Sequence, residues 1–199
     1  MDDTGRLLFA AVAIVLEFVG IFPYFRDIFR GTTRPHVFTW FSWGVINTVV
    51  AVAQFTSGGG AGTAVTAVVA LSCFSITLLA ARQGNKDITR SDWVCLIGSL
   101  LAIGSWTITR DALTAVIIVT VADMIAMIPT VRKTYKRPTE ETLSAWIISV
   151  FRNIFAILAL QSFAVVNWLY PASLIISDAA FVILLIVRRR QLDKSGIIV

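Results

Sequence analysis

Apolar residues fall into seven long blocks that short polar segments separate. Each block is roughly 18–24 residues long, which is the length of α-helix needed to cross a hydrocarbon core about 30 Å thick. The core of a soluble domain gives shorter apolar runs, because polar helix faces interrupt them. The pattern therefore predicts an all-α membrane protein with seven transmembrane helices, at residues 7–25, 37–55, 61–81, 91–108, 112–130, 142–160 and 166–187.

Composition supports this class. Hydrophobic residues make up 57% of the chain and charged residues 15%, whereas about 25% of a typical soluble domain is charged. The net charge of +5 would suit a nucleic-acid-binding protein. The cations lie in short segments between apolar blocks, however, so we expect no nucleic-acid partner. The first block is too long for a signal peptide and is predicted to be a permanent helix.

The basic residues collect in every second connection. Such a bias places the basic connections in the cytoplasm. We therefore predict a multi-pass protein of the cell membrane, with its N-terminus outside and its C-terminus in the cytoplasm, which requires an odd number of spans. The basic segments are 26–34, 82–90, 132–137 and 188–194, and the segments without net charge are 57–60, 110–111 and 161–167.

The chain also matches itself when it is shifted by 106 residues. The matched positions include rare residue types, and the lengths of helices and connections agree as well. We predict two three-helix repeats, residues 1–88 and 111–199 (the second including the cytoplasmic tail), joined by a linker helix in residues 89–110, with both repeats entering the membrane in the same sense. The matched pairs are Glu17 with Asp123, Pro23 with Pro129, Arg26 with Arg132, Trp40 with Trp146, and Asn47 with Asn153.

These features resemble the SWEET and PQ-loop (MtN3-like) transporter superfamily. Each repeat has a proline, then a basic connection, then a helix with a Trp and an Asn: Pro23, Trp40 and Asn47 in the first, and Pro129, Trp146 and Asn153 in the second. Tyr24 and Thr130 follow the prolines where the family motif has Gln, and spans 2 and 6 lack the proline of the sugar carriers. The resemblance implies a 3+1+3 fold and transport by alternating access.

Four charged side chains lie near the middle of predicted spans: Glu17, Asp123, Arg152 and Asp178. Charge at that depth is costly, so such residues normally pair or face a polar cavity. One interpretation is an ion pair between Arg152 and an acid that fixes helix packing. The other is a proton or charge site, because three acids face a single base.

A second group of candidates lies on the second helix of each repeat. Trp40, Trp43 and Asn47 share one helix stripe, and Trp146, Ser149 and Asn153 share the equivalent stripe. We predict that these residues bind substrate, together with Ser72 and Asp178, which are equivalent positions on the third helices. The alternatives are interhelical hydrogen bonding for the Asn residues and a membrane-interface position for Trp40 and Trp146.

Pro23 and Pro129 lie at the predicted cytoplasmic ends of spans 1 and 5. They are interpreted as paired hinges, with simple helix termination as the alternative.

Cys73 and Cys95 lie in apolar segments, and the single histidine, His36, lies in a connection. No CxxC pair or other metal-ligand spacing is present, so we expect neither a metal site nor a cofactor.

The favoured function is a carrier for a small polar solute such as a sugar, an amino acid or a similar metabolite. The alternative is a PQ-loop-type receptor or cargo-binding protein without net transport. A retinal protein is disfavoured because all four lysines lie outside the spans, and no catalytic or nucleotide-binding motif predicts an enzyme. The expected partners are the lipid bilayer, the solute and, as for some relatives, further copies of the chain in a homo-oligomer.

Overall fold

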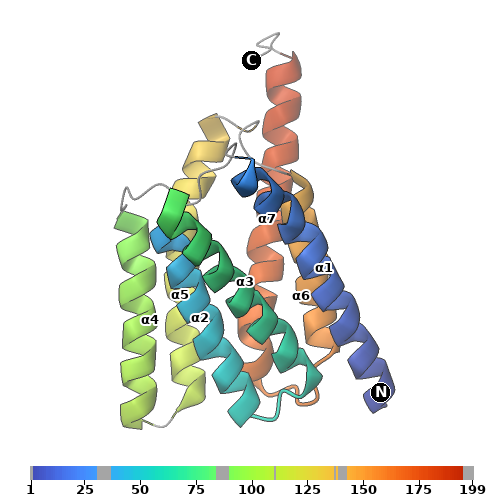
Figure 1. Cartoon of the computed structure of the whole chain (residues 1–199), viewed down its shortest axis with the longest axis vertical. Coiled ribbons are helices and arrows are strands. Elements are labelled where there is room, and N and C mark those ends of the chain that lie inside the picture. The colour runs from blue at the N-terminus through green and yellow to red at the C-terminus, as the bar shows by residue number, and fades with distance from the viewer. Residues whose placement is uncertain are drawn as a thin grey trace.

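A computed structural model describes residues 2–30, 37–83, 90–109, 111–136, 138 and 143–194. This part of the chain is all-α, with seven helices (Figure 1). Each helix coincides with one of the seven apolar blocks. The helices are α1 (Asp3–Phe29), α2 (Val37–Thr56), α3 (Ala61–Gln83), α4 (Arg90–Thr109), α5 (Ala112–Lys136), α6 (Leu143–Leu158) and α7 (Val165–Lys194).

Three helices are long and apolar enough to cross a membrane, which indicates a multi-pass membrane protein. The qualifying segments are Asp3–Arg26 in α1, Ala61–Arg82 in α3 and Val165–Leu192 in α7. Two shorter apolar segments, Ala112–Ile125 and Leu143–Leu158, lie in α5 and α6. These three candidate spans agree with the prediction of a multi-pass membrane protein, while the prediction that seven helices cross the membrane goes further than they do.

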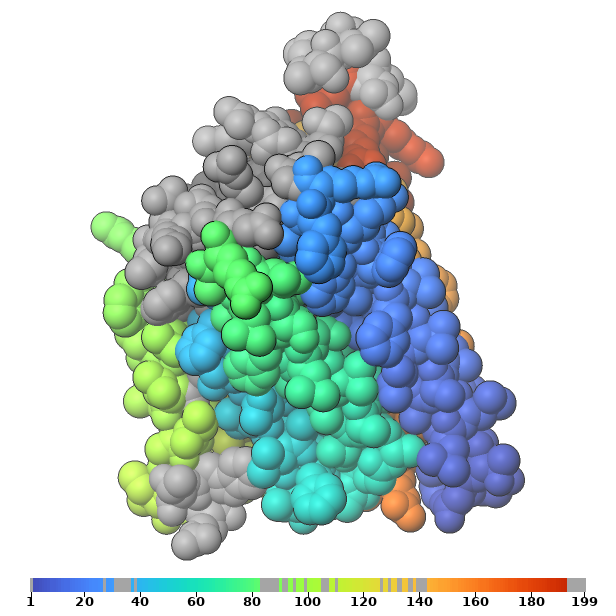
Figure 2. Space-filling view, viewed as in Figure 1, coloured from blue at the N-terminus to red at the C-terminus, as the bar shows by residue number. Residues whose placement is uncertain are grey.

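The distribution of polarity differs from that in a soluble protein. Large apolar side chains project outward, among them Phe22 of α1, Leu78 of α3 and Leu100 of α4, and these three helices form much of the face seen in Figure 2. Charged and amide side chains such as Glu17 and Asn153 are buried instead. Charged side chains are seldom buried in soluble proteins, whereas charged side chains within a membrane normally face the interior of the helix bundle.

The packing order is the same in α1–α3 as in α5–α7. In each set the third helix packs against both other helices, while the first and second make no close backbone approach within the described residues. The contacts between the sets also match. The first helix of each set packs on the second helix of the other set (α1 on α6, α5 on α2), and so does the third helix (α3 on α6, α7 on α2). The helix α4 packs on α5 and α2. The first helix of each set runs in the same direction (Figure 1).

Aspartates start the first helix of each set. Asp2 accepts a hydrogen bond from the Gly5 N–H at 3.1 Å, and Asp111 accepts from the Leu113 and Thr114 N–H groups at 3.1 and 3.2 Å. Such bonds satisfy N–H groups that have no partner within the first helical turn. A further bond from the Thr114 hydroxyl is the main reason that the pKa of Asp111 lies below its usual value.

The helix α1 does not end at Pro23 but continues to Phe29, so the interpretation of Pro23 as a simple helix terminator is wrong. A proline within a helix leaves the carbonyl four residues earlier, here that of Val19, without its helical partner. That is the property a hinge needs, and the hinge stays a prediction. Pro129 lies within α5, but its side chain lies outside the described residues.

The α2–α3 connection meets the α6–α7 connection at one end of the molecule, which we call the loop end (residues 57–62 and 159–164). The Gly62 N–H donates to the Ala159 carbonyl at 3.1 Å, and the Gln161 N–H donates to the Gly59 carbonyl at 3.0 Å. This approach requires glycine at position 60. Its φ of +64° favours glycine, and a Cβ there would lie 2.5 Å from the Gln161 Cβ.

Replacing Gly60 with alanine should therefore lower the free energy of unfolding by about 1–3 kcal/mol, through backbone strain and crowding. Gly104→Ala is the matched control, because a Cβ at Gly104 meets nothing within 4 Å and alanine favours the helix. Thermal unfolding in detergent would measure both variants. Equal melting temperatures for Gly60→Ala and Gly104→Ala would contradict this account of the loop end.

Candidate functional site: a buried polar cluster between the helix sets

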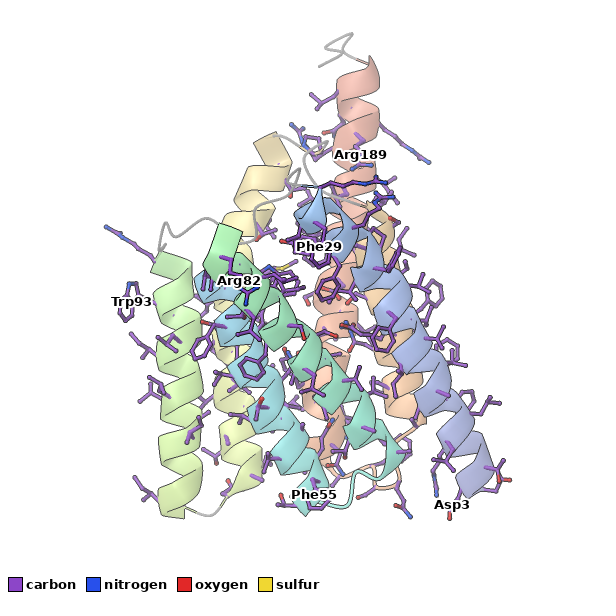
Figure 3. The ribbon with its side chains drawn as sticks, viewed as in Figure 1. Asp3, Phe29, Phe55, Arg82, Trp93 and Arg189 are labelled. Carbon is purple, nitrogen blue, oxygen red and sulfur yellow. The ribbon has the colours of Figure 1, made fainter. Side chains whose placement is uncertain are left out.

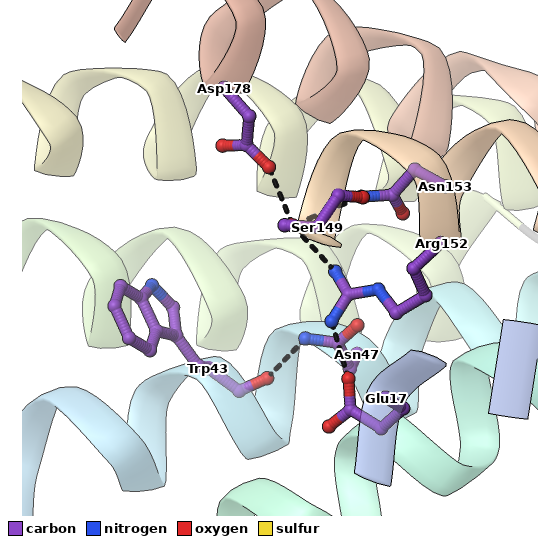
Figure 4. A network of polar contacts seen from close by, with 7 residues as sticks. All are labelled: Glu17, Trp43, Asn47, Ser149, Arg152, Asn153 and Asp178. Atoms are coloured by element: carbon purple, nitrogen blue, oxygen red, sulfur yellow. Dashed lines mark hydrogen bonds and ion pairs between the residues drawn. The ribbon is translucent and has the colours of Figure 1, made fainter. Parts of the chain in front are cut away.

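A buried ion pair joins the two helix sets at mid-helix. Arg152 of α6 contacts Glu17 of α1, with 2.5 Å between Arg152 Nη1 and Glu17 Oε2 (Figure 4). The side chains are 15% and 6% exposed, so the pair is largely shielded from its surroundings. Attraction between opposite charges is strong in such a low-dielectric environment. Of the three acids that the sequence offered to Arg152, the packing of α1 on α6 selects Glu17.

Ser149 extends this pair to a second acid. Arg152 Nη2 donates to Ser149 Oγ at 3.1 Å, and Ser149 Oγ donates to Asp178 Oδ2 at 2.6 Å. One hydroxyl therefore accepts from the guanidinium and donates to a carboxylate, and the chain of contacts links α1, α6 and α7 (Figure 4). Ser149 and Arg152 are three residues apart and so lie on one face of α6.

The two equivalent asparagines make equivalent bonds. Asn47 Nδ2 donates to the Trp43 carbonyl at 2.9 Å, and Asn153 Nδ2 donates to the Ser149 carbonyl at 2.9 Å. Both side chains are buried. Each amide thus bonds its own helix, one turn back, which leaves its oxygen for other partners. Asn153 Nδ2 also lies 3.4 Å from Ser149 Oγ.

Asp123 occupies the position in α5 that matches Glu17 in α1. Each acid faces the second helix of the opposite set: Glu17 contacts Arg152 of α6, and Asp123 lies near the Trp43 side chain of α2. The residue that matches Arg152 in the first set is Ile46, which is fully buried. The two halves of the interface are therefore similar in geometry but different in charge.

The predicted tryptophans pack against other aromatic rings. Trp40 Nε1 donates to the Tyr24 hydroxyl at 3.2 Å, and the Trp40 ring lies 5.3 Å from that of Trp43. Trp146 packs on Phe181 with 4.4 Å between ring centroids. Tyr24, Trp40 and Trp43 form a continuous aromatic group that leads to Asp123.

The third helices also contribute polar atoms. Ser72 of α3 and Asp178 of α7 are both buried. Cys73, next to Ser72, is a buried free thiol within electrostatic range of Glu17, Arg152 and Asp123. The side chain of Cys95 lies outside the described residues, as does His36. Among the described residues, no group of three or more His, Cys, Asp or Glu is placed to hold a metal.

The structure brings six of the predicted site residues into one region. Glu17, Arg152, Asn153 and Asp178 are linked through Ser149, while Asp123 is linked to Trp43 and lies within electrostatic range of Asp178. The sequence placed Ser149 on the same helix stripe as Trp146 and Asn153, but we did not count it among the predicted site residues. Together these residues offer carboxylates, a guanidinium, a hydroxyl and amides for hydrogen bonding and ion pairing with a polar solute.

Comparison of the chain with protein-family models, with curated proteins and with solved structures finds no significant match.

Proposed function

We propose that this chain is a membrane transporter for a small polar solute, such as a sugar, an amino acid or a similar metabolite. The observation that carries the proposal is the buried polar cluster centred on Arg152, which lies between two sets of three helices beneath an apolar exterior. Ionised groups within a membrane are costly and usually mark a substrate or ion pathway. A purely structural interface could use apolar residues at lower cost.

The proposed mechanism is alternating access between α1–α3 and α5–α7, with α4 as linker, as in SWEET-like carriers. The matched helix contacts and the common direction of the two sets support this arrangement. Parallel repeats related by an axis along the membrane normal are one transporter architecture. Because Glu17 and Arg152 belong to different sets, a relative movement of the sets would change their contact and expose the cluster to a solute.

In the proposed orientation the loop end faces outward and all seven helices cross the membrane. Arg82 and Arg189 lie at the opposite end from Asp3 and Phe55 (Figure 3), and the positive-inside rule assigns the arginine-bearing end to the cytoplasm. A cysteine introduced by Phe163→Cys, at an exposed position, should react with an impermeant maleimide added to intact cells. The exposed Arg190→Cys position should not. The reverse labelling would invert the topology.

Uptake by purified protein in proteoliposomes tests the transport proposal. A panel of radiolabelled sugars and amino acids should contain at least one solute whose uptake is saturable. Ser149→Ala should lower that uptake roughly tenfold or more, because it removes a hydroxyl that bridges two charged groups. Ser75→Ala is the matched control, since Ser75 is exposed and bonds its own helix. Solute binding without uptake would instead support the receptor or cargo-binding alternative.

A further inference from the structure

A proline in α7 creates a free carbonyl that α2 of the other set fills. Pro171 lies inside α7, and because proline has no N–H, the carbonyl of Asn167 four residues earlier loses its helical partner. Gln54 Nε2 donates to this carbonyl at 2.6 Å. A side chain of the first helix set thus completes the backbone bonding of the second set.

The Asn167 side chain reinforces the same contact. Its Nδ2 donates to the Ser57 carbonyl at 3.1 Å and to the Ser162 carbonyl at 3.0 Å. The bond to Ser57 crosses from the second set to the first, as do the two backbone bonds between residues 59–62 and 159–161. Gln54 and Asn167 are 1% and 0% exposed. Four hydrogen bonds between the sets therefore close the loop end in this structure.

This contact is well suited to reversible opening. Gln54 Oε1 and Asn167 Oδ1 are both buried without a hydrogen-bond partner among the described residues. A buried acceptor without a partner destabilises the closed arrangement. This cost offsets part of the stabilisation that the crossing hydrogen bonds give to that arrangement. Separation of the sets would give both oxygens access to water. The closed and open arrangements are thereby brought closer in free energy than the number of crossing bonds implies.

We propose that Gln54, Asn167 and Pro171 form a latch that holds the loop end closed and that must release before a solute can pass through that end. The inference rests on the proposed transport function, and it deepens it by assigning the element that regulates access. Pro171 favours the closed state, because without an N–H at this position the Asn167 carbonyl has no helical donor that competes with Gln54.

Distances between spin labels across the loop end test the latch. Labels would be placed by Thr56→Cys and Phe163→Cys, both exposed positions, in a Cys73→Ala, Cys95→Ala background in lipid nanodiscs. Gln54→Leu removes the donor, and Pro171→Ala supplies an N–H that competes for the Asn167 carbonyl. Each variant should raise the fraction of molecules with a long distance between the two labels about threefold or more. This is the change in an equilibrium that loss of one hydrogen bond produces.

Gln161→Leu is the matched control. Gln161 lies in the α6–α7 connection, and it bonds across the loop end through its backbone N–H and not through its side chain. Replacing the side chain should therefore leave the distribution of label distances as in the wild type. Unchanged distributions for both Gln54→Leu and Pro171→Ala would overturn the latch, as would an equal shift in Gln161→Leu. If the label distances shift as expected but the protein transports no solute, the transport function is rejected and the latch is kept. If the protein takes up solute but Gln54→Leu and Pro171→Ala leave the label distances unchanged, the latch is rejected and the transport function is kept.

Discussion

Replacing Arg152 with methionine should lower the free energy of unfolding by about 3–5 kcal/mol, the effect expected when one partner of a buried ion pair is removed. Methionine keeps much of the length of the side chain but loses the charge and the donors. Glu17, with a side chain 6% exposed, would be left as a buried carboxylate without a cation. Asp178 would lose the guanidinium that Ser149 places near it. Unfolding by titration with sodium dodecyl sulfate, followed by circular dichroism, would measure the loss.

Two controls separate lost pairing from lost packing. Arg6→Met breaks the pair with Asp3, whose side chain is 81% exposed, and should cost less than about 1 kcal/mol. The double variant Glu17→Gln, Arg152→Met removes both charges and should recover most of the stability lost in Arg152→Met. If the double variant were no more stable than Arg152→Met, the pair would matter through packing and not through charge.

The existence of the seven helices was predictable from the sequence, because an apolar block of membrane-spanning length is a strong signal. Their ends were less predictable. The helix α1 covers Asp3–Phe29 and α7 covers Val165–Lys194, each longer than the predicted block, because helices continue into polar segments that hydropathy does not count. The helix α6 ends at Leu158, before the predicted block does, because the Ala159 carbonyl and the Gln161 N–H bond to the α2–α3 connection and not within a continued helix.

The sequence predicted which residues belong to the candidate site better than it predicted which of them bond to each other. The sequence predicts that a single arginine in the middle of an apolar block pairs with an acid, but only the packing of α1 on α6 decides that the partner is Glu17 and not Asp123. The bond between Gln54 and Asn167 was missed altogether. Its signal was the proline four residues after Asn167, which frees a carbonyl but does not indicate which distant side chain will reach it.

Asp123 is the acid that we expect to couple transport to protons. The sequence made Glu17 and Asp123 equal candidates, but Glu17 is neutralised by Arg152. The groups that face Asp123 from the adjoining helices are Asp178 and Tyr170 of α7 and the Trp43 side chain of α2. None of these is a cation. The position that corresponds to Arg152 holds the apolar Ile46, so within the described residues no arginine or lysine is paired with Asp123.

In the proposed alternating-access mechanism, a carboxylate in this setting would carry a proton together with the solute. With one proton per solute, an inward gradient of one pH unit should drive accumulation of up to about tenfold, since one unit corresponds to about 1.4 kcal/mol. Asp123→Asn keeps the size of the side chain but cannot exchange a proton. The ratio of solute concentration inside to outside should therefore fall to about one, while uptake down the solute's own concentration gradient persists. Proteoliposome uptake with and without the gradient would measure both.

Asp111→Asn is the control for this experiment, because it makes the same substitution at the exposed start of the same helix and should leave accumulation unchanged. Glu17→Gln should act mainly on stability, since it leaves Arg152 without its acid. Wild-type uptake that ignores the gradient would make the protein a facilitator. Gradient-driven accumulation that survives Asp123→Asn would exclude Asp123 as the proton carrier and leave Asp178, which the Ser149 hydroxyl connects to Arg152, as the acid to replace next.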